Sequence, residues 1–205
     1  MTPDHVDDIA SYVSAVLSGA RPACKWGGLA VGRRVNDLGR SDSDDFPYRF
    51  DEQLAIKICK FSELFPHVKG KWANRVGRDA LIKLEPGQKF NLAMIFGWVH
   101  KATGLRKYRI VYLCIPRKNA KSVKAAIIGL YMMAADGEYG AEIYCGATSE
   151  KQALEVFRPA KKMAEKKPGY RAAYGVTCHA KKLEVDSIGI RAGKRYQPDG
   201  GRFEP

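Results

Sequence analysis

Hydrophobic residues recur at helical spacing in three stretches of the first half of the chain. This spacing predicts helices over residues 4–18, about 25–38 and 51–65, the last of which ends before Pro66 because the residue preceding a proline is disfavoured in the α region. A polar loop is predicted over 39–47, and residues 66–87, rich in glycine and charge, indicate a connection across a surface. The first 85 residues are therefore expected to form a helical arm.

In the second half, apolar runs with different periods alternate. Residues 90–100 predict an aromatic-rich helix, and residues 108–114 predict a strand. A buried helix over 121–135 and a strand over 141–147 follow, and Ser149 with Gln152 forms the pattern of a capping box that opens another helix. Shorter strand-like pieces are predicted over 172–178, 182–186 and 188–192. This order predicts an α/β fold with a mostly parallel sheet, in which strand 108–114 is central and covered by helix 121–135.

Composition excludes several classes of protein. Hydrophobic residues make up 45% and charged residues 28% of the 205, which is ordinary globular usage and not that of a disordered, collagenous or coiled-coil chain. The five cysteines contain no C-x-x-C pair, so reduced thiols are expected instead of a disulfide scaffold or a zinc ribbon. No apolar stretch is long enough for a membrane span, and the acidic N-terminus predicts no secretory signal.

The positive charge is concentrated in the second half of the chain. Of the net charge of +13, residues 1–102 carry +3 and residues 103–205 carry +10. Such an excess favours a polyanionic partner, because cationic side chains that contact phosphates release counterions. A merely solvated basic surface explains the charge equally well.

The segment 115–122, Ile-Pro-Arg-Lys-Asn-Ala-Lys-Ser, has the character of a phosphate-binding loop. Lys121 and Ser122 stand between a predicted strand and a predicted helix, where a lysine binds phosphates and a hydroxyl binds Mg²⁺. The two glycines of the G-x-x-x-x-G-K-[ST] pattern are replaced by Ile115 and Ala120. The glycine before the lysine commonly takes positive φ, which costs an alanine about 1 kcal/mol or more. Without further context, an ordinary Lys-Ser pair before a helix explains the motif as well.

Neighbouring polar residues extend this pattern. Arg117, Lys118 and Asn119 place two cations and an amide directly ahead of Lys121, where a triphosphate carries its charge. Gln88 lies upstream, and its amide is able both to donate to and to accept from an adenine edge. The alternative interpretation of Gln88 is a polar residue near a helix start.

Eight segments, spread in order over essentially the whole chain, carry a resemblance to a known family. They are Ala23–Trp26, Phe46–Phe50, Phe65–Gly70, Leu84–Phe90, Phe96–Trp98, Pro116–Ser122, Gly146–Ala153 and Arg202–Pro205. Through these segments the chain resembles the large terminase subunit of tailed bacteriophages, the motor that packages DNA into capsids.

The resemblance implies roles for individual residues. Gln88 corresponds to the adenine-sensing glutamine, Arg117 to the arginine of the family's variant phosphate loop, and Lys121 and Ser122 to its phosphate and Mg²⁺ residues. The family's loop also lacks the first glycine but usually has glycine before the lysine, where this chain has Ala120. ATP and Mg²⁺ are the implied cofactors, and the predicted ATP-binding set is Gln88, Arg117, Lys118, Asn119, Ala120, Lys121 and Ser122, with Ser122 reaching Mg²⁺ through ATP.

An ATPase motor also needs a strand that ends in Asp-Glu, where the aspartate holds Mg²⁺ and the glutamate orients the attacking water. Leu183–Asp186 is the nearest match, but its alternation is typical of a half-exposed strand. We therefore expect the chain to be the front part of a terminase, with a helical region over 1–85 and an incomplete P-loop ATPase core over 86–205, and to be inactive alone.

The resemblance further implies a partner set and a location. The partners are double-stranded DNA, the portal protein, the small terminase subunit and further copies in an oligomeric ring, and the location is the host cytoplasm, without membrane association. The alternative function is a catalytically dead accessory module that binds DNA or protein.

Overall fold

The computed structural model describes residues 5–138, 140–185, 189–191, 194–196 and 201–205. Contacts divide the chain into two compact units that interleave along the sequence: Met1–Glu63 with Lys83–Leu113, and Leu64–Ile82 with Cys114–Pro205. The predicted boundary between residues 85 and 86 falls within the first unit. As a division of function, that boundary stays a prediction.

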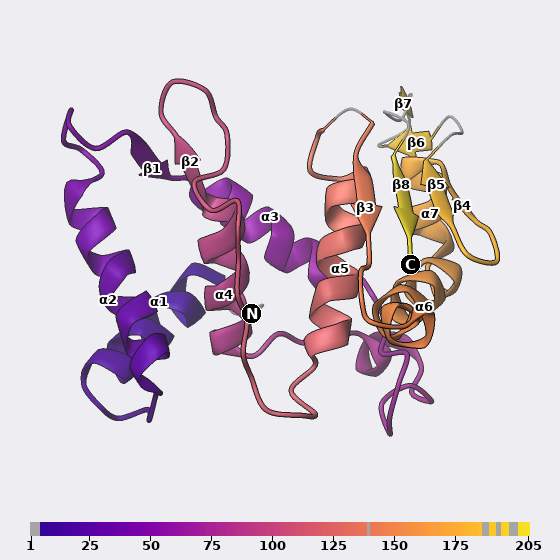
Figure 1. The fold of residues 1–205 in the computed structure, drawn as a ribbon, viewed down its shortest axis with the longest axis horizontal. Helices are drawn as coiled ribbons and strands as arrows, with labels where there is room; N and C mark the ends of the chain where they lie inside the picture. Colours follow the sequence, from indigo (N-terminus) through magenta and orange to yellow (C-terminus); the bar gives the residue numbers. More distant parts are fainter. Residues whose placement is uncertain (1–4, 139, 186–188, 192–193, 197–200) are drawn as a thin grey trace. The chain divides into compact units, whose positions relative to one another are not determined.

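Four helices and a two-stranded sheet form the first unit (Figure 1). The helices are α1 (His5–Leu17), α2 (Lys25–Arg40), α3 (Glu52–Ser62) and α4 (Pro86–Gly97). The first three confirm the helices predicted from hydrophobic spacing. Their apolar faces meet in one cluster of buried residues, which consists of Ile9, Val13, Val31, Ala55, Phe90 and Ala93. Burial of these side chains from four helices is the main source of the unit's stability.

The fourth predicted helix is shifted toward the N-terminus. It begins at Pro86 and ends at Gly97, because Trp98–His100 form strand β2, which pairs antiparallel with β1 (Tyr48–Phe50). A proline at the first helical position is favoured, since its missing N–H has no intrahelical partner there. Trp98 is fully buried, with its ring 5.4 Å from that of Phe50 and 6.2 Å from that of Phe46. These aromatic contacts hold β2 against β1 and the loop before it.

Three α-helices, a short 3₁₀ turn and two sheets form the second unit. The α-helices are α5 (Lys121–Ala134), α6 (Glu150–Lys166) and α7 (Pro168–Tyr174), and the 3₁₀ turn is η1 (Gly77–Ala80). The larger sheet has the order β3-β8-β5-β4, with β3 (Glu142–Tyr144), β8 (Arg202–Glu204), β5 (Leu183–Val185) and β4 (Val176–Cys178). A separate hairpin pairs β6 (Gly189–Arg191) with β7 (Lys194–Tyr196).

The predicted mixture of helices and strands is therefore present, but the described sheets are small and mixed. In the four-stranded sheet, β3 and β8 are parallel, whereas β5 is antiparallel to both β8 and β4. The strand-like piece predicted over 172–178 is wrong in its first half, which is helix α7. Pro168 opens this helix and Gly175, with φ of 65°, ends it.

The central strand predicted over 108–114 is wrong. The residues have no regular secondary structure, and Ile110 and Tyr112 are 91% and 89% exposed. Pairing with β2 ends at Lys107, whose N–H donates to the carbonyl oxygen of Trp98 at 2.8 Å. Beyond that point no strand of the described residues lies beside the segment. A β-favouring sequence forms a strand only where a neighbouring strand accepts its hydrogen bonds.

The helix predicted over 121–135 is confirmed as α5, which ends at Ala134. It is largely buried, with Leu130 and Tyr131 at most 1% exposed. At Gly129 the helix approaches β8 so closely that an added Cβ would lie 2.5 Å from the ring of Phe203. Glycine at this position therefore allows the sheet to pack on the helix. No helix among the described residues has the length and apolar character to cross a bilayer.

Candidate nucleotide-binding site

The N-terminus of α5 is the structural centre of the predicted site. Residues 115–120 enter the helix as an irregular loop (Figure 1), and the helix begins where Lys124 N–H donates to the carbonyl oxygen of Ala120 at 2.9 Å. Ala120 is the N-cap residue and its side chain offers no capping group. The first N–H groups of a helix point along its axis and carry partial positive charge, so an uncapped start is suited to binding an anion.

The loop before α5 contains two left-handed residues. Lys118 has φ of 69° and Ala120 has φ of 57°, and among the described residues they alone combine positive φ with a side chain. The left-handed conformation costs an L-residue roughly 1–2 kcal/mol. The sequence predicted positive φ at Ala120 from the glycine that usually precedes the lysine, and the structure has it. Backbone strain of this kind is concentrated at functional sites.

Side chains of the loop bond to its own main chain. Lys121 Nζ donates to the carbonyl oxygen of Ile115 at 2.7 Å. Asn119 Nδ2 donates to the carbonyl oxygens of Pro116 and Arg117 at 3.3 and 3.2 Å. The bond from Lys121 joins the two ends of the loop, and the bonds from Asn119 hold its middle.

The remaining predicted phosphate-binding residues differ in exposure. Arg117 and Lys118 are exposed, whereas Ser122 is half-buried in the first turn of the helix. The structure therefore brings Arg117, Lys118, Asn119, Ala120, Lys121 and Ser122 into one short segment. Three cations there surround a helix start, an arrangement that attracts a polyphosphate.

A further cation, Lys124, lies one turn into α5 and was not among the predicted site residues. It is only 5% exposed, and burial lowers its pKa from the usual value. Its position three residues after Lys121, on the same side of the helix, was the sequence signal for a role at the site. The apolar residues around it predicted instead an ordinary buried helix.

Gln88 has a structural role in the first unit. The Glu85 N–H donates to Gln88 Oε1 at 3.1 Å, so the glutamine side chain caps the start of α4. The spacing of a capping box, with Gln at the third helical position, was the sequence signal for this role. Gln88 belongs to the first unit and residues 115–122 to the second. Its assignment as the adenine reader stays a prediction.

The nearest match to the Asp-Glu strand, Leu183–Asp186, contains β5, which is a half-exposed strand. Leu183 and Val185 of β5 are buried, whereas Glu184 faces the surface with His179 Nε2 at 2.9 Å from its carboxylate. The hydrogen bond from Lys182 is the largest cause that lowers the pKa of Glu184. Asp186 lies outside the described residues. The described residues contain no cluster of three or more His, Cys, Asp or Glu side chains suited to a metal ion.

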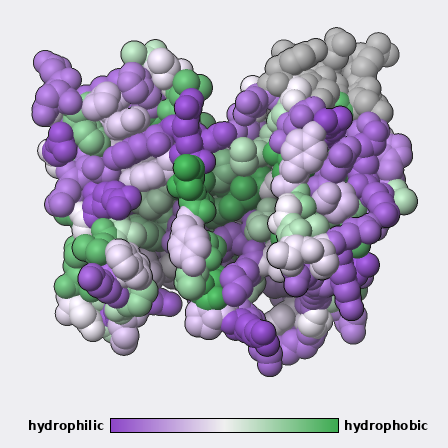
Figure 2. Space-filling view, in the orientation of Figure 1, coloured by the Kyte–Doolittle hydropathy of each residue, from purple (hydrophilic) through white to green (hydrophobic). Residues whose placement is uncertain are grey.

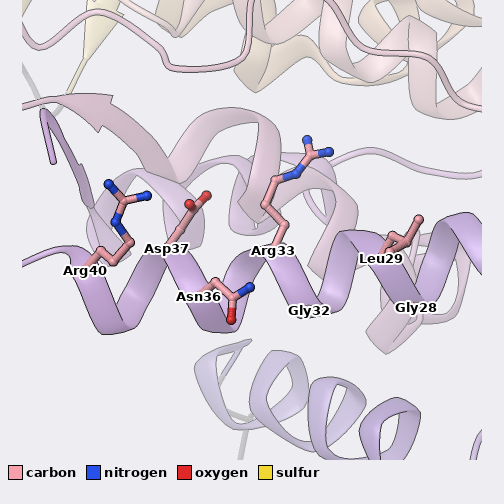
Figure 3. A pocket seen from close by; sticks show the side chains of 7 residues that line it. All are labelled: Gly28, Leu29, Gly32, Arg33, Asn36, Asp37 and Arg40. Atoms are coloured by element: carbon pink, nitrogen blue, oxygen red, sulfur yellow. The ribbon is translucent and has the colours of Figure 1, made fainter.

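A shallow groove of about 430 Å³ lies on α2 (Figure 3). It is lined by Gly28, Leu29, Gly32, Arg33, Asn36, Asp37 and Arg40. Asp37 is ion-paired with Lys107 and accepts a hydrogen bond from Tyr108 Oη at 3.4 Å. None of the predicted nucleotide-binding residues lines this groove, so it supplies no pocket for the predicted site.

The second unit is thus a mixed α/β unit with a cationic loop at an uncapped helix N-terminus, a construction typical of anion-binding sites. Residues 86–174 match the family described as terminase large subunit, ATPase domain. The match runs from α4 to α7 and includes the whole loop 115–122. It confirms the resemblance to terminase large subunits. No curated protein and no solved structure shows significant similarity to the chain.

Proposed function

We propose that the loop 115–122 binds ATP as part of a terminase motor that packages viral DNA. The observation that carries the proposal is the left-handed Ala120 directly before Lys121 and Ser122, at the uncapped start of α5 and inside the family match. Lys121 compensates the charge of the phosphates, and the N–H groups of the first helical turn bind their oxygens.

Each further residue has a role in this proposal. Ser122 holds Mg²⁺, which supplies charge compensation to the phosphates when it is bound. Arg117 and Lys118 neutralise the outer phosphate oxygens, and Asn119 keeps the loop folded through its bonds to Pro116 and Arg117. Gln88 reads the adenine edge with its amide N–H groups, since its carbonyl oxygen accepts from Glu85.

The wider biology rests on the family alone. Double-stranded DNA is the proposed substrate that the motor moves. The portal protein and the small terminase subunit are the proposed partners. The motor is proposed to act as a ring of subunits in the cytoplasm of an infected bacterium. A mostly parallel P-loop sheet is the proposed setting of the loop.

A second function has one observation in its favour. Lys121 already bonds to the loop carbonyl of Ile115 at 2.7 Å, so the loop is satisfied by its own groups. A chain that retained the motor's shape without nucleotide binding would be a basic accessory module for DNA or protein.

Calorimetric titration of residues 1–205 with ATP and Mg²⁺ separates the two functions. ATP binding that is lost in Lys121→Ala supports the motor, because removal of the ammonium leaves phosphate charge uncompensated. Lys181→Ala is the matched control, since Lys181 is an exposed lysine of the same unit, ion-paired with Glu150 at 2.5 Å. Equal affinity of Lys121→Ala and the unmodified chain, or no binding by either, would favour the accessory module.

A further inference from the structure

A loop of the second unit, residues 66–80, presents a tryptophan surrounded by cations. Trp72 is 39% exposed, with the Arg75 guanidinium carbon 3.9 Å and Lys71 Nζ 5.1 Å from the centre of its ring. The His67 ring lies 6.1 Å from the indole on a tilted plane. Its sequence, rich in glycine and charge, predicted only a connection, and none of the roles described above uses it.

The loop is attached to α6 at two points. Lys69 Nζ lies 2.8 Å from a carboxylate oxygen of Glu155, and Lys166 Nζ donates to the carbonyl oxygen of Ala73 at 3.3 Å. Glu155 and Lys166 are eleven residues apart, which corresponds to about 16 Å along a helix. Figure 1 shows the loop beside α6. These anchors hold the loop along roughly three turns of the helix.

The same side of α6 carries its own cations between the anchors. Arg158 and Lys162 are exposed and stand at helical spacing from Glu155 and Lys166. In the loop, residues 66–80 contain four Lys and Arg against one Asp. Figure 2 shows hydrophilic side chains together with side chains of intermediate hydropathy over the face of α6 that is in view. We call Lys71, Trp72, Arg75, Arg158 and Lys162 the Trp72 surface.

Contacts of this kind favour phosphates over bases. A guanidinium stacked on an indole keeps its N–H donors at the edge of the plane and loses little freedom when it binds an anion. Arg75 and Lys71 lie against the ring of Trp72, so a base that stacks there competes with two cations that the ring already holds. About 16 Å of helix corresponds to roughly five phosphates of one strand at 3.4 Å each.

We infer that the Trp72 surface binds the phosphate backbone of duplex DNA without reading its sequence. The inference deepens the proposed function by assigning the DNA contact to a place in the chain, and it rests on that function for the choice of a duplex. Trp72 is a positioning residue in this account, because it holds Arg75 and Lys71 and contributes no charge of its own.

The test is the salt dependence of binding to a duplex of random sequence, measured by fluorescence anisotropy with residues 1–205. Lys71→Ala/Arg75→Ala should lower the affinity at least tenfold at low salt. It should also reduce the slope of log K against log salt by about 1.8, which is the loss of two phosphate contacts. The control Lys25→Ala/Lys60→Ala removes two exposed cations from the first unit and should leave the slope unchanged.

Variants of the tryptophan distinguish positioning from bulk charge. Trp72→Ala removes no charge, yet should weaken duplex binding about threefold or more because Arg75 and Lys71 lose their support. Trp72→Phe keeps an aromatic face and should restore part of the affinity. Circular dichroism and thermal unfolding are the measurements that check whether the variants remain folded.

Four results would overturn the inference. The first is an unchanged slope and affinity in Lys71→Ala/Arg75→Ala, and the second is a control pair that is equally impaired. The third is tighter binding of single strands with quenching of Trp72 fluorescence, which would indicate base stacking. The fourth is equal binding of polyglutamate, which would indicate an acidic protein partner. Lys121→Ala should retain duplex binding, so failure of the ATP proposal and failure of this one are separable.

Discussion

Lys121 and Ile115 close the loop at the start of α5, because the lysine ammonium donates to the isoleucine carbonyl oxygen at 2.7 Å. An ammonium has three donors, so this bond leaves further donors for phosphate oxygens. The bond also means that ATP competes with a carbonyl of the protein. Lys121 is therefore both the closing contact of the loop and its proposed ligand for phosphate.

Replacement of Ala120 by glycine should stabilise the loop. The left-handed φ of 57° costs alanine about 1–2 kcal/mol, whereas glycine adopts it freely but loses about 0.5–1 kcal/mol of backbone entropy. The net gain in the free energy of unfolding should be about 0.5–1 kcal/mol, and ATP affinity should rise with it. Chemical denaturation and calorimetric titration measure the two quantities.

Ala125→Gly is the matched control for that change. Ala125 is exposed within α5, so glycine there should destabilise the protein by about 1 kcal/mol. A loss of stability or of affinity in Ala120→Gly would mean that the loop does not hold the left-handed turn in solution.

Replacement of Gly129 by alanine should destabilise the second unit, although alanine is the better helix former. The new Cβ would lie 2.5 Å from the ring of Phe203, which is 1% exposed and packed 5.9 Å from the ring of Phe157. Overpacking of this kind costs about 1–3 kcal/mol. Gly32→Ala in α2 meets no atom within 4 Å and should instead stabilise by about 0.5–1 kcal/mol. Thermal unfolding that shows the same sign for both variants would contradict the packing of α5 on β8.

Acid should destabilise the first unit through His5. Burial is the largest cause that lowers the pKa of His5 below 6.5, and the carboxylate of Glu63, 3.7 Å away, acts in the opposite direction. Because the unfolded chain then binds the proton more tightly than the folded one, this contribution is fully present above about pH 6.5 and is lost as the pH falls through the folded pKa.

The measurement for His5 is the free energy of unfolding in urea at pH 8 and at pH 5.5. His5→Gln should reduce the difference between the two values. The pKa of His67 is lowered in the same direction, by burial first and Arg75 second, so His5→Gln/His67→Gln should reduce the difference further. An unchanged pH dependence in His5→Gln would show that this histidine is solvated in the folded state.

Residues 1–205 should hydrolyse ATP at least about a thousandfold more slowly than ~1 per second, even where they bind it. Lys121 and Ser122 are placed to hold phosphates, but phosphoryl transfer also needs an acid that orients the attacking water. Glu184, the acid on the nearest candidate strand, is turned to the surface and paired with Lys182 and His179. Steady-state phosphate release is the measurement, with Lys121→Ala as the control for contaminating ATPases. Turnover near ~1 per second that disappears in that variant would place a catalytic acid within the chain.

The sequence was sufficient to predict those features of the structure that depend on residues close to one another in the chain. The helices of the first unit follow from apolar spacing, and the positive φ of Ala120 follows from the glycine it replaces. The strand predicted over 108–114 is wrong for the opposite reason. A strand forms only beside another strand, and the residues of the segment do not specify that partner. Gln88 shows a third case, in which one side chain fits both a helix cap and a base reader. The Trp72 surface was not predicted because the cations of the loop and those of α6 come together only when the loop packs on the helix.

The position of β8 in the sheet means that the second unit is able to complete its sheet only late in synthesis. β8 lies between β3 and β5, so Glu142 of β3 pairs with Arg202, sixty residues later in synthesis. At about 5–20 residues per second, β3 waits roughly 3–12 s for its partner strand. During that interval α5 has no Phe203 against Gly129 and exposes apolar surface that a chaperone is able to cover. A pause in translation before residue 200 would lengthen this interval, so synonymous codon choice near the β8 segment should influence the yield of folded protein.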